Sequence, residues 1–184
     1  MSFASSWLAL REPADAAARD RGLLAELAEW SGGRALPTTD LGCGTGATLR
    51  ALAPYAPALE WTLLDNDAAL LEEAAARTGA RVRTASALFD LVSVEWLGRF
   101  AQALAPDVAV YAALSYDGRE TWSPAPPHEA QALAAFLRHQ AGDKGFGPSL
   151  GPQAGATLAG MLAQRGWKVR LADSAWRLGA GDGA

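Results

Sequence analysis

The run Asp40-Leu41-Gly42-Cys43-Gly44-Thr45-Gly46 combines one acidic residue with three glycines at alternate positions. Glycine has no Cβ atom, so its backbone can approach a ligand closely and adopt a positive φ angle. A helix that begins directly after such a turn points its free N–H groups toward the ligand. We therefore interpret residues 40–46 as a cofactor site, in which Asp40 binds a cationic amino group directly or through water.

The same residues also satisfy the dinucleotide-binding pattern G-x-G-x-x-G/A, through Gly42, Gly44 and Ala47. Asp65 supplies the acid that this pattern expects about 20 residues further along. Two features favour a different cofactor, because the carboxylate of Asp40 would repel a pyrophosphate and Gly46 opens the turn more than the pattern requires. A nicotinamide-dependent (NAD(P)) oxidoreductase stays open as the less favoured alternative.

Residues 40–46 resemble the D-x-G-x-G-x-G signature of the class I S-adenosylmethionine-dependent methyltransferases. Leu63-Leu64-Asp65-Asn66-Asp67 resembles the acidic end of that family's second strand, and the two motifs occur in the family's order. The resemblance covers residues 39–114 well and the remainder loosely. It implies an α/β, Rossmann-like methyltransferase fold with a mostly parallel central sheet flanked by helices, and a methyl transfer from S-adenosyl-L-methionine.

The resemblance also implies which residues hold the cofactor. In that family the glycine loop lies against the methionine part and the ribose, and the acid that ends the second strand accepts hydrogen bonds from the ribose hydroxyls. Carried over, Asp65 holds the ribose and Asn66 lies beside the adenine. Residues 84–92 resemble the segment where the family's fourth strand ends, so Ser86 and Ala87 are expected to touch the cofactor through their backbone.

An N-terminal helix face carries Trp7, Arg11, Asp15 and Arg19 at four-residue spacing. One interpretation is a cap on the cofactor, in which an arginine meets its carboxylate. The other is a solvated face, in which Asp15 pairs with Arg11 and Arg19. The expected cofactor-binding residues are Asp40, Gly42, Cys43, Gly44, Thr45, Gly46, Asp65, Asn66, Ser86, Ala87 and Arg11, with Cys43 packing beneath the loop rather than acting as a nucleophile.

Residues that act on the methyl acceptor are expected after the late strands. Tyr116 and Asp117 are the candidates for catalysis, although Asp117 beside Gly118 is also typical of a turn. Residues 115–152, rich in Pro, Gly and aromatic side chains, are expected to form a lid or a wall of the acceptor pocket. Because no general base is identifiable, an S-adenosylmethionine-binding regulatory or interaction protein without catalysis remains an alternative.

Length and composition limit the class of protein. The 184 residues predict a single domain, residues 1–184, in which residues 1–33 form a helical cap. A net charge of −4 argues against a nucleic-acid partner and favours a small-molecule acceptor. One cysteine and two histidines without ligand spacing predict no metal site. The sequence has no signal peptide and no apolar run long enough to span a bilayer. We therefore expect no membrane partner and a cytoplasmic protein.

Hydrophobic periodicity predicts a helix over residues 8–30, with a break near Glu12 before Pro13 and a stop at Gly32. Further helices are expected at 47–55, 68–78, 95–104, 129–140 and 154–165, and strands at 35–41, 59–64, 81–87, 107–114, 167–171 and 176–178. Residues 79–83 are too few for the family's third strand and its connection to the fourth. Either that strand is absent or some residues are omitted from the sequence there, and we favour the omission. Whether residues also follow Ala184 stays open.

Overall fold

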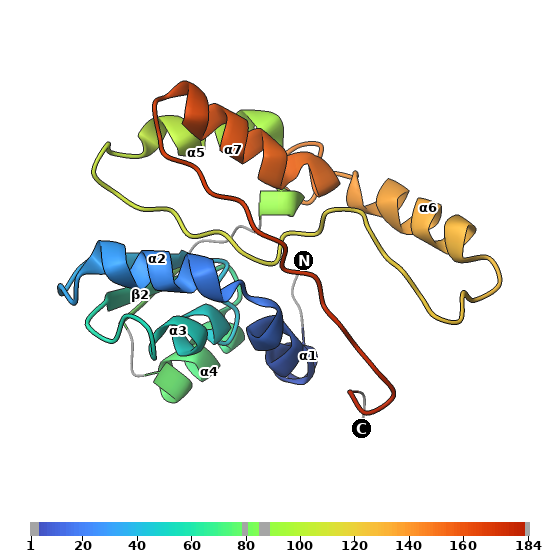
Figure 1. The fold of residues 1–184 in the computed structure, drawn as a ribbon, viewed down its shortest axis with the longest axis horizontal. Helices are drawn as coiled ribbons and strands as arrows, with labels where there is room; N and C mark the ends of the chain where they lie inside the picture. The colour runs from blue at the N-terminus through green and yellow to red at the C-terminus, as the bar shows by residue number, and fades with distance from the viewer. Residues whose placement is uncertain (1–3, 79–80, 85–88, 183–184) are drawn as a thin grey trace. The chain divides into compact units, whose positions relative to one another are not determined.

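The computed structural model describes residues 4–78, 81–84 and 89–182 (Figure 1). The chain divides into two compact units. The first comprises Met1–Ala87, Tyr111–Leu114 and Arg170–Ala184, and the second Leu88–Val110 and Ser115–Val169. The single domain over residues 1–184 stays a prediction, and each unit is described by itself below.

Two helices begin the first unit: α1 (Ser5–Ala18) and α2 (Arg21–Ser31). The predicted break near Glu12 is wrong, because α1 continues through Pro13 and the helices separate at Arg19 and Asp20. The side chain of Asp20 accepts a hydrogen bond from the Leu23 N–H at 2.8 Å, which caps the first turn of α2. The predicted stop is confirmed, since Gly32 ends α2 with a φ of 55°.

A three-stranded parallel sheet forms the centre of the first unit, in the order β1 (Pro37–Leu41), β2 (Glu60–Asp65) and β3 (Arg81–Thr84). Helices α3 (Ala47–Leu52) and α4 (Ala68–Thr78) follow the first two strands. The structure thus confirms an α/β protein with a parallel sheet. Asp40 is in register with Leu63, so the segments that follow β1 and β2 leave the sheet at the same edge.

The position of β3 in the sheet differs from the one that we expected, because residues 84–92 resembled the end of the family's fourth strand. In a doubly wound sheet the third strand lies beside the second, and the fourth lies on the other side of the first. Because β3 pairs with β2, it takes the place of the third strand. In the described residues no strand pairs with the other edge of β1. Ser86 and Ala87 lie outside the described residues.

The core of the first unit lies where the helices meet β2. Leu63 of β2 is fully buried and packs with Cys43 and with Leu71 and Ala74 of α4. Leu49 of α3 packs against the same cluster. Burial of these side chains holds the two helices on the sheet, since each buried aliphatic side chain contributes roughly 1.5–3 kcal/mol.

The strands predicted at residues 107–114, 167–171 and 176–178 are wrong: the described residues there form no ladder with another strand. Without a partner, the alternating apolar pattern gains neither backbone hydrogen bonds nor a buried face. Val108, Leu171 and Leu178 accordingly stay exposed at 40, 74 and 59%. At Leu114 a φ of 61° interrupts the extended backbone.

The second unit is built from η1 (Phe89–Leu91), α5 (Val94–Ala103), α6 (Glu129–Gln140), η2 (Gly151–Gln153) and α7 (Ala154–Gln164). Figure 1 shows α5 and α7 side by side. The rings of Phe89, Trp96 and Phe100 pack with centroid separations of 5.1 to 6.4 Å, and the edge of Phe146 meets Trp96. No helix in the described ranges is both long and apolar enough to cross a bilayer.

Candidate cofactor site

The glycine loop, residues 42–46, joins β1 to α3. Gly42, Gly44 and Gly46 have φ angles of 65°, 52° and 85°, a region that residues with a Cβ atom rarely adopt. The Cys43 N–H donates to the Leu64 carbonyl at 3.0 Å, which holds the loop against the end of β2. The alternate glycines are therefore required by the path of the backbone.

Asp65 connects the glycine loop to the end of β2. Its Oδ2 accepts from the Gly44 N–H at 2.9 Å and its Oδ1 from the Asp67 N–H at 3.0 Å. The residue is 7% exposed. Each carboxylate oxygen can accept a second hydrogen bond, so Asp65 keeps capacity for a hydroxyl group. The exposed Asn66 follows it directly.

Asp40, at the end of β1, has a buried oxygen without a hydrogen-bond donor. In the described part of the chain, no group donates to its Oδ2. Burial raises the pKa of Asp40 to about 7; Arg19 opposes this rise, and the negative charge of Asp65 adds to it. An ionised Asp40 therefore lacks the donor that a buried carboxylate requires.

Arg19, between α1 and α2, is the buried cation whose charge lowers the pKa of Asp40. It is 7% exposed, and its Nη2 donates to the Thr48 Oγ1 at 3.3 Å. Its Nε has no hydrogen-bond partner among the described residues, and its guanidinium lies 5.9 Å from the ring centroid of Tyr111. Asp40 and Arg19 thus place a carboxylate and a guanidinium at one site, each with an unused polar atom.

Arg11, the arginine that we expected at the cofactor, is engaged elsewhere. Its Nε and Nη2 donate to Asp15 at 2.8 and 3.1 Å, and its guanidinium lies 5.1 Å from the Trp176 ring centroid. The Trp176 Nε1–H also donates to Asp15, at 3.0 Å. The four-residue spacing pointed equally to Arg11 and Arg19. What distinguishes Arg19 is its burial near Asp40, and this burial depends on the tertiary structure.

Cys43 and Thr45 face the protein interior. Burial, together with Asp40 and Asp65, raises the pKa of the Cys43 thiol to about 12, so the thiol stays protonated. Its place in the core with Leu63 fits the packing role that we expected. Thr45 is 2% exposed, and its carbonyl accepts from the Arg50 Nη1 at 2.6 Å.

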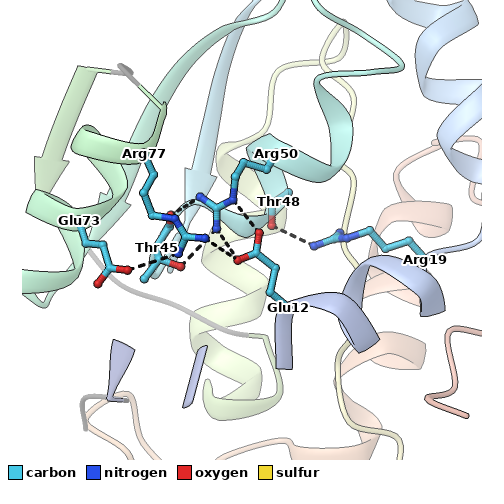
Figure 2. A network of polar contacts seen from close by, with 7 residues as sticks. All are labelled: Glu12, Arg19, Thr45, Thr48, Arg50, Glu73 and Arg77. Carbon is cyan, nitrogen blue, oxygen red and sulfur yellow. Dashed lines mark hydrogen bonds and ion pairs between the residues drawn. The ribbon is translucent and has the colours of Figure 1, made fainter. Parts of the chain in front are cut away.

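A polar network connects α1 to the glycine loop, α3 and α4 (Figure 2). The Arg50 Nε and Nη2 donate to the two carboxylate oxygens of Glu12 at 2.6 and 2.7 Å. The Arg77 Nη2 donates to Glu12 at 3.1 Å, and its Nη1 to Glu73 at 3.3 Å. Hydrogen bonding to Arg50 is the largest effect on the pKa of Glu12 and lowers it, so Glu12 stays ionised near neutral pH.

A small cavity of about 120 Å³ lies beside this network, lined by Glu12, Asp15, Ala16, Arg19, Ala47, Arg50 and Ala51. Pockets for drug-sized ligands measure about 300–1,000 Å³. The cavity is therefore too small for an entire nucleoside cofactor in this conformation.

The two candidates for catalysis lie in the second unit. The Tyr116 hydroxyl donates to Glu120 at 2.7 Å; burial, followed by Glu120, raises the pKa of the phenol above its usual range. Asp117 accepts from the Arg119 N–H at 3.0 Å and from its Nε at 2.7 Å, and the Arg119 side-chain bond lowers the pKa of Asp117. A protonated phenol and a low-pKa carboxylate are both weak bases.

No protein-family model matches this chain, and no curated protein shows significant similarity to it. In the parts of the chain that the structure describes, no three His, Cys, Asp or Glu side chains are grouped so that they could hold a metal ion.

Proposed function

We propose that this protein is an S-adenosylmethionine-dependent methyltransferase acting on a small-molecule acceptor. One observation carries the proposal: a loop of three left-handed glycines follows β1, is joined to Asp65 at the end of β2, and adjoins the buried Oδ2 of Asp40, to which no group in the described part of the chain donates. Ligands of open α/β sheets bind outside the carboxyl ends of the strands, where these groups lie.

The residues at this edge fit the parts of the cofactor. Asp40 would accept from its ammonium group and Arg19 would donate to its carboxylate, since each has an unused polar atom. Asp65 would accept from the ribose hydroxyls, with Asn66 beside the adenine. When bound, the cofactor supplies a methyl group on a sulfonium centre. The protein's own part is then chiefly to position the acceptor, with a base required only if the acceptor loses a proton.

The buried carboxylate of Asp40 favours this cofactor over a dinucleotide, because it would repel a pyrophosphate. Calorimetric titration with S-adenosylmethionine, S-adenosylhomocysteine and NAD tests the choice. We expect micromolar binding of the first two alone, which corresponds to about 8 kcal/mol. Binding of NAD without the other two would overturn the proposal.

Asp65→Asn tests the ribose contact. We expect cofactor binding to weaken by about 1–3 kcal/mol, since a charged acceptor is lost and the amide keeps only one of the two oxygens that accept from the Gly44 and Asp67 N–H groups. Glu60→Gln, at the exposed opposite end of the same strand, is the control and should leave the affinity unchanged. Equal affinities of the Asp65→Asn variant and the wild type, measured by calorimetry, would remove Asp65 from the site.

Catalysis needs a separate test, because a binding protein would pass both titrations. Incubation with S-adenosylmethionine and a panel of small hydroxyl, amine, thiol and carboxylate acceptors should yield S-adenosylhomocysteine with at least one class. Tight cofactor binding without turnover on the whole panel would favour the regulatory protein over the enzyme.

A further inference from the structure

We propose that α1 is a gate over the glycine loop, that Glu12 holds the gate closed, and that the cofactor binds when α1 moves off the loop. The inference rests on the proposed function and adds a control of access to the same site.

In this structure α1 covers the loop. The Cδ1 atom of Leu8 lies 3.1 Å from the position that a Cβ atom on Gly44 would take. Thr45 within the loop and Asp65 bonded to it are 2 and 7% exposed, and the Oδ2 of Asp40, which has no donor among the described residues, is buried. A ligand that lies against the backbone of Gly44 would therefore displace the Leu8 side chain of α1.

Little apolar burial holds α1 in this place. Asp15 is the one buried residue of α1, a helix that the structure describes in full, and Trp7 and Leu10 are 45 and 57% exposed. Apolar burial, the main source of helix docking energy, is therefore small here. The polar contacts of Glu12 and Asp15 consequently decide how firmly the helix is attached.

Glu12 joins α1 to both α3 and α4. It receives hydrogen bonds from two arginines on different helices, Arg50 on α3 and Arg77 on α4 (Figure 2). Arg50 in turn binds the Thr45 carbonyl of the loop. The side chains of Glu12 and Arg50 are 20 and 24% exposed, so solvent screens the pair less than it screens a surface pair.

The junction with α2 is suited to act as a hinge. Arg19 and Asp20 both have extended backbone angles, and Asp20 caps α2 independently of α1. Arg19 is buried and bonded to Thr48. A rotation of α1 about this junction would break the contacts of Leu8 and Glu12 while Arg19 keeps its place near Asp40.

Glu12→Gln tests the gate in the full chain. Hydrogen exchange of the α1 amides, measured without ligand, should become roughly five- to thirtyfold faster, because a partly buried ion pair with two arginines is lost. The Kd for S-adenosylhomocysteine should fall by the same factor, because apparent affinity scales with the fraction of binding-competent protein. Glu73→Gln, which removes the Arg77–Glu73 pair alone, should change neither quantity.

A measurement on the unaltered protein guards against a variant that folds poorly. Raising the salt concentration from about 0.05 to about 0.5 M should speed exchange in α1, since the ion pairs of Glu12 are partly screened. Unchanged exchange in Glu12→Gln and at high salt, or faster exchange in Glu12→Gln without tighter binding by that variant, would overturn the gate. Failure of the wild type to bind either adenosyl ligand would overturn the proposed function instead, because exchange is measured without ligand.

Discussion

At the scale of single residues, the site is set by one acidic and one basic side chain, each with a buried polar atom. Asp40 and Arg19 each keep one polar atom without a partner among the described residues. Such an arrangement is costly in a folded protein unless something binds there. The α-amino acid part of S-adenosylmethionine carries both complementary charges, which is why these two residues rather than Arg11 carry our proposal.

Asp40 should make the stability of the protein depend on pH. Its pKa rises from 3.8 to about 7 on folding, so the folded state holds this proton more tightly than the unfolded state. The free energy of unfolding therefore has its full contribution from Asp40 in acid. This contribution is lost as the pH rises toward and through 7. Above pH 7 the loss is on the order of 4 kcal/mol. Asp40→Asn removes this dependence. Urea unfolding between about pH 5 and pH 8.5 should show the variant gaining stability relative to the wild type; parallel pH curves would contradict the burial of an unpaired carboxyl.

Arg19 should contribute to binding through the carboxylate of the cofactor. We expect Arg19→Gln to weaken S-adenosylhomocysteine binding by about 1–3 kcal/mol, as a charged hydrogen bond is lost. Binding of 5′-methylthioadenosine, which lacks the amino acid part, should be unaffected. Arg34→Gln is the matched control, because Arg34 donates to the Ser31 and Trp30 carbonyls at the end of α2. An equal loss for both ligands would show that Arg19 acts on the fold rather than on the carboxylate.

At the scale of elements, local sequence signals predicted the helices well. The expected ranges 68–78 and 129–140 coincide with α4 and α6, because apolar periodicity and nearby stop residues act within the segment itself. Strands were predicted correctly only where a neighbour exists. The apolar run at residues 107–114 has strand propensity, yet β-pairing depends on a partner that the run itself cannot specify.

Gly44 should be the least replaceable glycine of the loop. Its φ of 52° and the nearby Leu8 Cδ1 give Gly44→Ala two costs, backbone strain and a steric clash. Gly33, with a φ of 69° and open space around it, isolates the backbone cost. In urea unfolding we expect Gly33→Ala to lose about 1 kcal/mol and Gly44→Ala about 1–3 kcal/mol more. Equal losses would mean that Leu8 does not press on the loop.

At the scale of the whole molecule, the residues that we propose for cofactor binding and the candidates for acceptor binding fall in different units. Asp40, the glycine loop and Asp65 belong to the first unit, and Tyr116 and Asp117 to the second. Methyl donor and acceptor are therefore expected to be recognised by separate parts of the chain.

This division predicts separable effects of substitutions. Tyr116→Phe and Asp117→Asn should leave the stabilisation by S-adenosylhomocysteine intact, whereas Asp65→Asn should reduce it. At a ligand concentration of 100 Kd the wild type should gain about 2.7 kcal/mol, a rise of roughly 5–11 °C in Tm. Differential scanning fluorimetry measures all three variants. A loss of the ligand shift in Tyr116→Phe would place that residue at the cofactor.

The sequence by itself determined the glycine turn, the acid at Asp65 and most helices, because glycine conformation, capping and periodicity are properties of short segments. It also pointed to Asp40, through its place before the turn. Only the tertiary structure decided that Arg19 rather than Arg11 is buried near Asp40, that Asp65 binds the Gly44 N–H, and that α1 covers the loop. These contacts join residues that are far apart in the chain. Burial, hydrogen-bond partners and pKa values depend on such contacts, so they could not be read from short segments of the sequence.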